Sequence, residues 1–340
     1  MGSIGSDMQH VLVTGGAGYA GSVLVPQLLR SGYKVTVYDI CYFGSDFLPL
    51  DNPNLTLVVG DIRNTAKLRK ALEGVDIVVN LACISNDASF ELDENLSTSI
   101  NLNAFEPMVL AAKDAGVKRF VYASSSSVYG VSDEPNVTED HPLVPLTLYN
   151  KYKGMCEPLL KKHTSDDFVG VIFRPATLCG YAPRQRLDLS VNILTNHAVN
   201  NNKITVFGGD QMRPNLHVKD YCDAVEMLMT APAAKVQNEI FNIGFQNMSI
   251  ADLALLVKDV VEQEFPEKAP IDIVTTPSND NRSYHINSDK VTRVLGFRPK
   301  YSIEDAVRDL CHAFKEGKLP NSMTDVKYYN VKMLKAKEAA

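Results

Sequence analysis

The first half of the chain alternates short, continuous apolar runs with longer segments in which apolar residues recur at helical spacing. The apolar runs predict strands at 11–14, 34–39, 55–59, 75–79, 119–123 and 168–173. The segments between them predict helices at 19–31, 64–73, 95–115 and 148–164. Strands that are apolar throughout and separated by helices are typical of a parallel sheet covered on both faces. The pattern therefore predicts an α/β fold built on a doubly wound parallel sheet.

After about residue 178 the pattern changes, because glycine and proline divide the chain into shorter elements. Clear helical patterns remain at 249–264 and 302–315, and we expect them in a smaller C-terminal α/β lobe over the carboxyl edge of the sheet. The predicted parts are a sheet domain at 8–178 with returning elements near 218–243, a smaller substrate-binding lobe at 179–318, and loosely ordered ends at 1–7 and 319–340.

The composition is that of an ordinary globular chain: of 340 residues, 45% are hydrophobic and 22% are charged, with a net charge of −6. This charge offers no basic surface for nucleic acid, and no apolar run reaches the roughly eighteen residues that span a membrane. The six cysteines include no Cys-x-x-Cys pair, which predicts reduced thiols and a cytoplasmic protein. The seven histidines show no metal-ligand spacing, so no metal site is expected.

A glycine-rich turn follows the first predicted strand. Gly15, Gly18 and Gly21 recur at three-residue spacing between that strand and the next helix. The first glycine allows a sharp turn, the second lets the backbone approach a diphosphate, and the third lets the helix pack closely on the sheet. The N-terminus of the helix adds partial positive charge. The turn predicts a dinucleotide site, although the pattern alone also occurs in turns that bind nothing.

Asp39 ends the second predicted strand, where a carboxylate can accept the two hydroxyls of an adenosine ribose. The same charge would repel a 2′-phosphate, and none of the next three residues is an arginine, so the sequence favours NAD over NADP. The alternative is a solvated acid at a strand end. After the third strand, Asp61 either meets the adenine of the cofactor or caps the helix that begins near Asn64.

Tyr149 and Lys153 lie four residues apart in a predicted helix and so share one of its faces. A phenol has an ordinary pKa of about 10 and is a weak base at neutral pH, but a neighbouring ammonium favours its anionic form. Such a phenolate can take a hydroxyl proton while a cofactor removes hydride from the same carbon. The pair also occurs on ordinary helix surfaces. Four serines, 124–127, follow the fifth strand at the edge where doubly wound folds bind ligands, which supports the catalytic interpretation.

With these motifs the chain resembles the extended short-chain dehydrogenase/reductase family, in its NAD-dependent epimerase/dehydratase branch with a Rossmann-type fold. The resemblance covers roughly residues 9–315. Its further motifs are Asn80-Leu81-Ala82, Asn101, Arg174-Pro175, 213–220 and Leu295-Gly296-Phe297. The resemblance implies an enzyme that acts on a nucleotide-diphosphate sugar, holds NAD tightly and forms a homodimer through two helices, here 95–115 and 148–164.

The resemblance also implies roles for individual residues. Ser125, four residues before Tyr129, matches the serine or threonine that hydrogen-bonds the sugar. Tyr149 matches the catalytic base, and Lys153 matches the lysine that holds the nicotinamide ribose. Arg213 and Arg282 match two arginines that bind the diphosphate of the sugar nucleotide, and guanidinium groups suit phosphate oxygens. The implied cofactor contacts are Gly15, Gly18, Tyr19, Ala20, Gly21, Asp39, Asp61, Ile62, Leu81, Ala82, Asn101, Tyr149 and Lys153, and the implied substrate contacts are Ser126, Thr177, Arg213 and Arg282.

The chain departs from its family at positions that bear on the reaction. Ser126 and Ser127 stand where dehydratases and sugar-acid decarboxylases of the family carry an acid, and Thr177 stands where many members carry an asparagine. The resemblance therefore implies an epimerase that oxidises C4 of the sugar transiently. A 4-dehydrogenase or ketoreductase with net redox change would use the same residues, and a non-catalytic NAD-sensing protein is the remaining alternative. The sequence leaves open the nucleobase, the sugar, and the role of Asn86 and Asp87.

Overall fold

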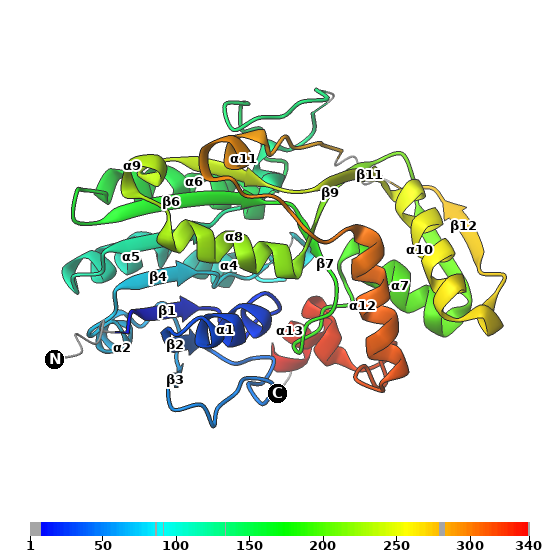
Figure 1. Ribbon diagram of the computed structural model, residues 1–340, viewed down its shortest axis with the longest axis horizontal. Helices are drawn as coiled ribbons and strands as arrows, with labels where there is room; N and C mark the ends of the chain where they lie inside the picture. The colour runs from blue at the N-terminus through cyan, green and yellow to red at the C-terminus, as the bar shows by residue number, and fades with distance from the viewer. Residues whose placement is uncertain (1–7, 86, 91, 133, 279–282, 339–340) are drawn as a thin grey trace, which may run out of the picture.

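Seven parallel strands form the central sheet in a computed structural model, which describes residues 8–338 except 86, 91, 133 and 279–282 (Figure 1). In spatial order they are β10 (Ile240–Ile243), β6 (Val169–Pro175), β5 (Arg119–Ala123), β4 (Ile77–Asn80), β1 (His10–Thr14), β2 (Lys34–Asp39) and β3 (Leu55–Val59). Every neighbouring pair is parallel. The chain order reverses between β1 and β4, which opens a crevice at their carboxyl ends. The predicted doubly wound fold is confirmed.

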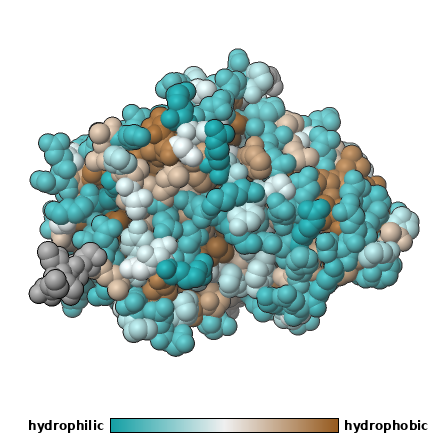
Figure 2. Space-filling view, in the orientation of Figure 1, coloured by the Kyte–Doolittle hydropathy of each residue, from teal (hydrophilic) through white to brown (hydrophobic). Residues whose placement is uncertain are grey.

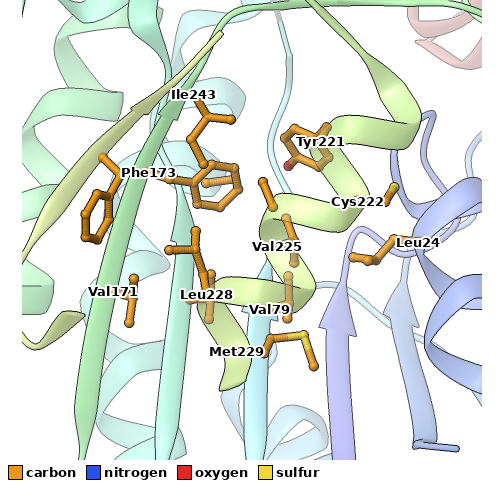
Figure 3. Packing of buried hydrophobic residues seen from close by; sticks show 14 of the residues in the cluster. Leu24, Val79, Val171, Phe173, Tyr221, Cys222, Val225, Leu228, Met229 and Ile243 are labelled. Atoms are coloured by element: carbon orange, nitrogen blue, oxygen red, sulfur yellow. The ribbon is translucent and has the colours of Figure 1, made fainter. Parts of the chain in front are cut away.

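Helices cover both faces of this sheet. On one face lie α1 (Gly21–Arg30), α8 (Val218–Thr230), α9 (Ala233–Val236) and α11 (Asp289–Leu295), and on the other lie α2 (Thr65–Ala71), α5 (Phe105–Asp114) and α6 (Leu148–His163). Figure 3 shows Phe173 and Ile243 of the sheet packed against Tyr221, Val225 and Leu228 of α8. Burying one such side chain stabilises the fold by about 1.5–3 kcal/mol. The packed helices therefore stabilise the sheet whose carboxyl ends form the crevice.

The helix predicted at 95–115 is interrupted in the structure. It consists of α4 (Glu94–Thr98), a π-helical turn η1 (Ser99–Asn103) and α5. A π-helical turn accommodates an extra residue and redirects the side chains on it. Here it turns Asn101 inward, where its side-chain amide accepts a hydrogen bond from Ile84 N and donates one to Ile84 O, both at 2.8 Å. Asn101 therefore fixes the loop that follows β4.

A second lobe stands beside the carboxyl edge of the sheet (Figure 1). Its helices α7 (Ser190–Asn201), α10 (Ile250–Glu264) and α12 (Ile303–Lys315) enclose a core with the two parallel strands β8 (Lys203–Phe207) and β12 (Asp272–Thr276). A three-stranded sheet of β7 (Thr177–Cys179), β9 (Met212–His217) and β11 (Gln246–Ser249) joins the two lobes. The remaining short elements are α3 (Asp87–Phe90), η2 (Ser126–Tyr129), η3 (Pro266–Lys268) and η4 (Val326–Tyr328).

The chain after Lys318 differs from the expectation of a loosely ordered end. Leu319, Tyr328 and Tyr329 are buried against Leu187 and α12. The helix α13 (Asn330–Glu338) then lies between the two lobes, drawn in red in Figure 1. The polar composition of the segment hid these apolar anchors, because only a few of its side chains are buried. The described residues 319–338 thus contain buried anchors and a helix, whereas residues 1–7 and 339–340 lie outside the described part of the chain.

The surface is mainly polar. Hydrophilic residues cover most of the face in Figure 2, with small hydrophobic patches between them. Within the described ranges no helix is long and apolar enough to cross a membrane.

Candidate active site

A cavity of about 300 Å³ lies along the carboxyl ends of β1, β2 and β4. The expected cofactor contacts that line it are Gly15, Gly18, Tyr19, Ala20, Gly21, Asp39, Asp61, Ile62, Leu81, Ala82, Tyr149 and Lys153. Asn101 does not line the cavity; it acts one step behind it, through the backbone of Ile84.

Glycines build the floor of this cofactor cavity. Gly15 has φ +73°, and a Cβ there would lie 2.7 Å from Ala82 N. A Cβ on Gly21 would lie 2.4 Å from Gly16 O, so only glycine lets α1 begin this close to the glycine-rich turn. The first turn of α1 has no side-chain cap and no acidic residue. Its N-terminus therefore presents partial positive charge to the cavity, as an anionic ligand requires.

Asp39 is held at the end of β2 by the backbone. Its Oδ2 accepts a hydrogen bond from Ala17 N at 2.9 Å, and its Oδ1 accepts one from Cys41 N at 2.8 Å. Burial raises the pKa of the carboxyl group, and these two hydrogen bonds oppose the rise. Each carboxylate oxygen has more than one acceptor position, so Asp39 can brace the glycine-rich turn and still receive hydroxyl groups.

Asp61 lies at the far end of the cofactor cavity and carries an ion pair. Arg63 Nη2 lies 2.5 Å from its Oδ2, and this hydrogen-bonded pair holds the pKa of the Asp61 carboxyl below its usual value. The cap of α2 is Asn64, whose side chain accepts a hydrogen bond from Lys67 N at 3.0 Å. Of the two roles considered for Asp61, helix capping is therefore wrong.

A second cavity, of about 880 Å³, opens between the sheet and the smaller lobe. Both volumes fall in the usual range for small-molecule sites. Seven residues line both cavities: Tyr19, Ser85, Ser124, Tyr149, Pro175, Leu178 and Arg186. Tyr149 is the only one of these that the sequence assigned to acid–base chemistry. The structure thus places Tyr149 at the boundary between the two cavities.

Hydrogen bonds order the serine-rich strand end beside Tyr149. Ser125 Oγ and Ser127 Oγ lie 2.7 Å apart, and Ser127 Oγ donates to Asn150 Oδ1 at 2.5 Å. The helix α6 begins at the cap Thr147, whose hydroxyl accepts a hydrogen bond from Asn150 N at 3.3 Å. The buried Lys153 donates from Nζ to Ala123 O at 2.8 Å. The ammonium is therefore fixed at the carboxyl end of β5, on the same face of α6 as Tyr149.

A buried ion pair supports this arrangement from behind. Glu157 accepts hydrogen bonds from Arg174 Nε at 2.9 Å and Arg174 Nη2 at 2.7 Å, and from Ser124 Oγ at 2.6 Å. Both charged side chains are at most 4% exposed. Burial lowers the pKa of the Arg174 guanidinium, but Glu157 outweighs this and raises it above its ordinary value. The pair ties α6 to β6 directly beneath the serines.

The expected substrate residues separate into two groups. Ser126, Thr177 and Arg213 line the second cavity, and Arg213 Nη1 donates to Met212 O at 3.0 Å. Arg282 lies outside the described residues. Of the two residues whose role the sequence left open, Asn86 also lies outside them, and Asp87 begins the short helix α3.

Sequence reasoning missed several of the residues that line the cofactor cavity, among them the polar side chains Ser85, Arg184, Arg186 and Asn330. Two of them belong to Pro183-Arg-Gln-Arg186, directly after β7 at the carboxyl edge of the sheet. Two arginines at a ligand-binding edge were a usable signal. Asn330 carried none, because its position depends on how the C-terminal segment packs.

Comparisons with known proteins agree with this geometry. The profile of the NAD dependent epimerase/dehydratase family matches residues 11–244. The Low-salt glycan biosynthesis protein Agl12 of Haloferax volcanii is 31% identical over 305 residues, which cover 87% of this chain and 96% of that protein. The UDP-glucose 4-epimerase of Lactobacillus helveticus is 28% identical, over 87% of this chain and 94% of that protein. The chain belongs to the NAD-dependent epimerase/dehydratase family.

A solved structure extends the similarity to three dimensions. DesIV, a dTDP-glucose 4,6-dehydratase from Streptomyces venezuelae crystallised with NAD, matches with a TM-score of 0.80 and 26% identity, over 91% of this chain and 98% of DesIV. The cavity described above fits that cofactor, because it combines a glycine cradle, an uncapped helix N-terminus and a carboxylate at the end of β2. The family resemblance is confirmed, and the protein is an NAD-dependent enzyme.

Proposed function

We propose that the protein is a nucleotide-sugar epimerase that acts through transient oxidation at C4 of the sugar. The observation that carries the proposal is the position of Tyr149, which lines both the cofactor cavity and the larger second cavity. A single proton-transferring group at that boundary suits a reaction in which one sugar carbon is oxidised and then reduced.

The residues divide the chemistry between them. NAD, when bound, would supply the acceptor and donor of hydride. The Tyr149 phenol oxygen takes the proton of the C4 hydroxyl and later returns it. Lys153 keeps a positive charge beside that oxygen and favours its anionic form. Ser125 hydrogen-bonds the sugar hydroxyl and is itself oriented by the hydroxyl of Ser127.

The serines after Ser125 separate epimerisation from dehydration. Loss of water from C5 and C6 needs an acid for the departing hydroxyl and a base for the C5 proton. Ser126 and Ser127 line the second cavity, and neither hydroxyl ionises near neutral pH. The hydroxyl of Ser127 is in addition committed to Asn150. We therefore expect a 4-ketosugar to persist until it is reduced.

A substrate panel tests the proposal. The purified protein is incubated with UDP-, GDP-, CDP- and dTDP-sugars, and the products are identified by NMR. We expect one class to be converted into its epimer, with little net change in nicotinamide absorbance over many turnovers. Steady accumulation of reduced nicotinamide would instead identify a 4-dehydrogenase, and failure to convert any sugar nucleotide would contradict enzymatic action on this class.

Asp39 is expected to set the preference for NAD over NADP. Its charge would repel the 2′-phosphate of NADP. In Asp39→Ala the ratio of the Kd for NADP to the Kd for NAD should therefore fall by at least about tenfold. Asp39→Asn is the matched control for the brace on the glycine-rich turn, because it removes the charge and keeps an acceptor for a backbone N–H. Titration of the cofactor-free protein with each nucleotide measures the ratio. Equal Kd values of the native protein for NAD and NADP would show that Asp39 does not contact the adenosine ribose.

Arg213 is expected to act on the sugar nucleotide and not on NAD. It lines the second cavity and not the first, so Arg213→Ala should weaken binding of the sugar nucleotide by about tenfold to a hundredfold, the usual effect of losing a charged hydrogen bond. The Kd for NAD should not change. Calorimetric titrations measure both. An equal loss of NAD affinity in a folded variant would assign Arg213 to the cofactor site or to the scaffold.

Assembly and location remain proposals. We expect a homodimer through α4, α5 and α6, and large apolar side chains on α5 and α6, Leu110 and Met155, are 38% and 42% exposed. All six cysteines are free thiols, which supports a cytoplasmic location.

A further inference from the structure

Arg184 is a buried cation that faces the cofactor cavity without a full set of partners. The residue is 4% exposed and lines that cavity. Its guanidinium lies over the ring of Phe43, 3.7 Å from the ring centroid, and its Nη2 donates to Asn330 Oδ1 at 2.6 Å. Among the described residues its Nε has no hydrogen-bond acceptor, although the atom is buried. A buried donor left unpaired costs stability, so a ligand that supplies an acceptor would be favoured here.

The charges around Arg184 are already committed to other groups. Asp188 accepts hydrogen bonds from Arg186 Nε at 2.8 Å and from Asn330 N at 2.9 Å. Asp39 is held by the backbone, as described above. Arg186, which is the other charged neighbour, repels Arg184. Burial, reinforced by Arg186, lowers the pKa of Arg184 to about 9. The carboxylates of Asp188 and Asp39 attract Arg184 through space, but no ion pair within the described residues includes it, so its guanidinium could still pair with a ligand anion.

Two contacts of Arg184 indicate where its guanidinium lies in the cofactor cavity. Arg184 N donates to Ser22 Oγ at 3.2 Å, and Ser22 belongs to the first turn of α1. Phe43, on which the guanidinium stacks, follows Asp39 beyond the end of β2. The guanidinium therefore lies between the N-terminus of α1, where this fold holds a diphosphate, and the strand end that receives the ribose.

We propose that Arg184 binds the diphosphate of the cofactor and closes it against the N-terminus of α1. Asn330 is the positioning residue, because its side chain holds one end of the guanidinium. The helix α13 thereby links the C-terminal segment to cofactor retention. The inference concerns the cofactor cavity alone and does not rest on the choice of epimerisation as the reaction.

Binding of cofactor fragments tests this assignment without any measurement of turnover. Full-length protein, freed of nucleotide, is titrated with adenosine, 5′-ADP and 2′,5′-ADP. In Arg184→Gln the Kd for 5′-ADP should rise by about tenfold to a hundredfold, while the Kd for adenosine stays unchanged. 2′,5′-ADP carries a single 5′-phosphate and no diphosphate, so its Kd should rise by a smaller factor than that of 5′-ADP. Arg69→Gln is the matched control, since it removes a charge from an exposed pair with Asp114 and should change none of these constants.

Thermal unfolding separates a ligand-binding arginine from a structural one. Because Arg184 is an incompletely paired buried cation, Arg184→Gln should leave the Tm of the nucleotide-free protein equal or higher, and should reduce the rise in Tm that 5′-ADP produces. Asn330→Ala should weaken 5′-ADP binding less than Arg184→Gln and also spare adenosine. A lower Tm with unchanged 5′-ADP binding, or equal losses for adenosine and 5′-ADP, would overturn the proposal. A loss confined to 2′,5′-ADP would place the guanidinium at the ribose 2′ position and would overturn it too.

Discussion

Replacing Tyr149 by phenylalanine is expected to lower turnover by at least about a hundredfold. The variant keeps the ring that lines both cavities and removes only the oxygen that exchanges the proton. Binding of NAD and of the sugar nucleotide should change little, so the loss should appear in kcat and not in KM. Steady-state kinetics on the substrate found in the panel gives both constants.

The control for this variant lies on the same helix. Tyr152 is within one turn of Tyr149 on α6 but lines neither cavity. Tyr152→Phe makes the same chemical change and should retain the native kcat. Near-normal turnover in Tyr149→Phe would remove the proton-transfer role from this residue and with it the mechanism proposed above.

Removing the carboxylate of Glu157 is expected to cost about 3–5 kcal/mol of the free energy of unfolding. Glu157→Ala leaves Arg174 as an unpaired charge that is 3% exposed, and it also takes away the acceptor of Ser124. The loss is large because neither group can recover its partner from water. Denaturant unfolding of the native protein and the variant, at one fixed NAD concentration, measures it.

An exposed ion pair provides the comparison. Arg69 and Asp114 are 49% and 59% exposed, and Asp114→Ala should cost at most about 1 kcal/mol. If Glu157→Ala costs no more than Asp114→Ala, the pair beneath the serines is not a determinant of stability, and the support that we assign to it is wrong.

The fold was predictable because its signals are local. A continuous apolar strand such as Leu55–Val59 and the helical periodicity around it fit in a window of about twenty residues. The same holds for the Gly15 turn and the Tyr149/Lys153 spacing, which the structure brings to one cavity. Each motif depends on neighbours within one turn or one strand, so its physics can be recognised without knowing the rest of the chain.

The features that escaped prediction depend on contacts between distant segments. Arg184 and Asn330 are 146 residues apart in sequence and meet only because α13 packs between the lobes. The π-helical turn that aims Asn101 at Ile84 likewise lies against α6, a helix that begins 45 residues later in the chain. The burial of Tyr328 and Tyr329 required knowledge of the groove that α12 and Leu187 provide. Local patterns carry no information about such pairings.

The measurement that tests the central claim most directly is the fate of the sugar protons during turnover in deuterium oxide. An enzyme with Ser126 and Ser127 after Ser125 has no acid–base pair there for elimination, so the product should be a C4 epimer that keeps its C6 oxygen and carries no solvent deuterium at C5. NMR and mass spectrometry of the isolated sugar nucleotide give both results. A 6-deoxy-4-keto product with solvent deuterium at C5 would contradict the account, identify a dehydratase and bring Asp87 into the catalytic set.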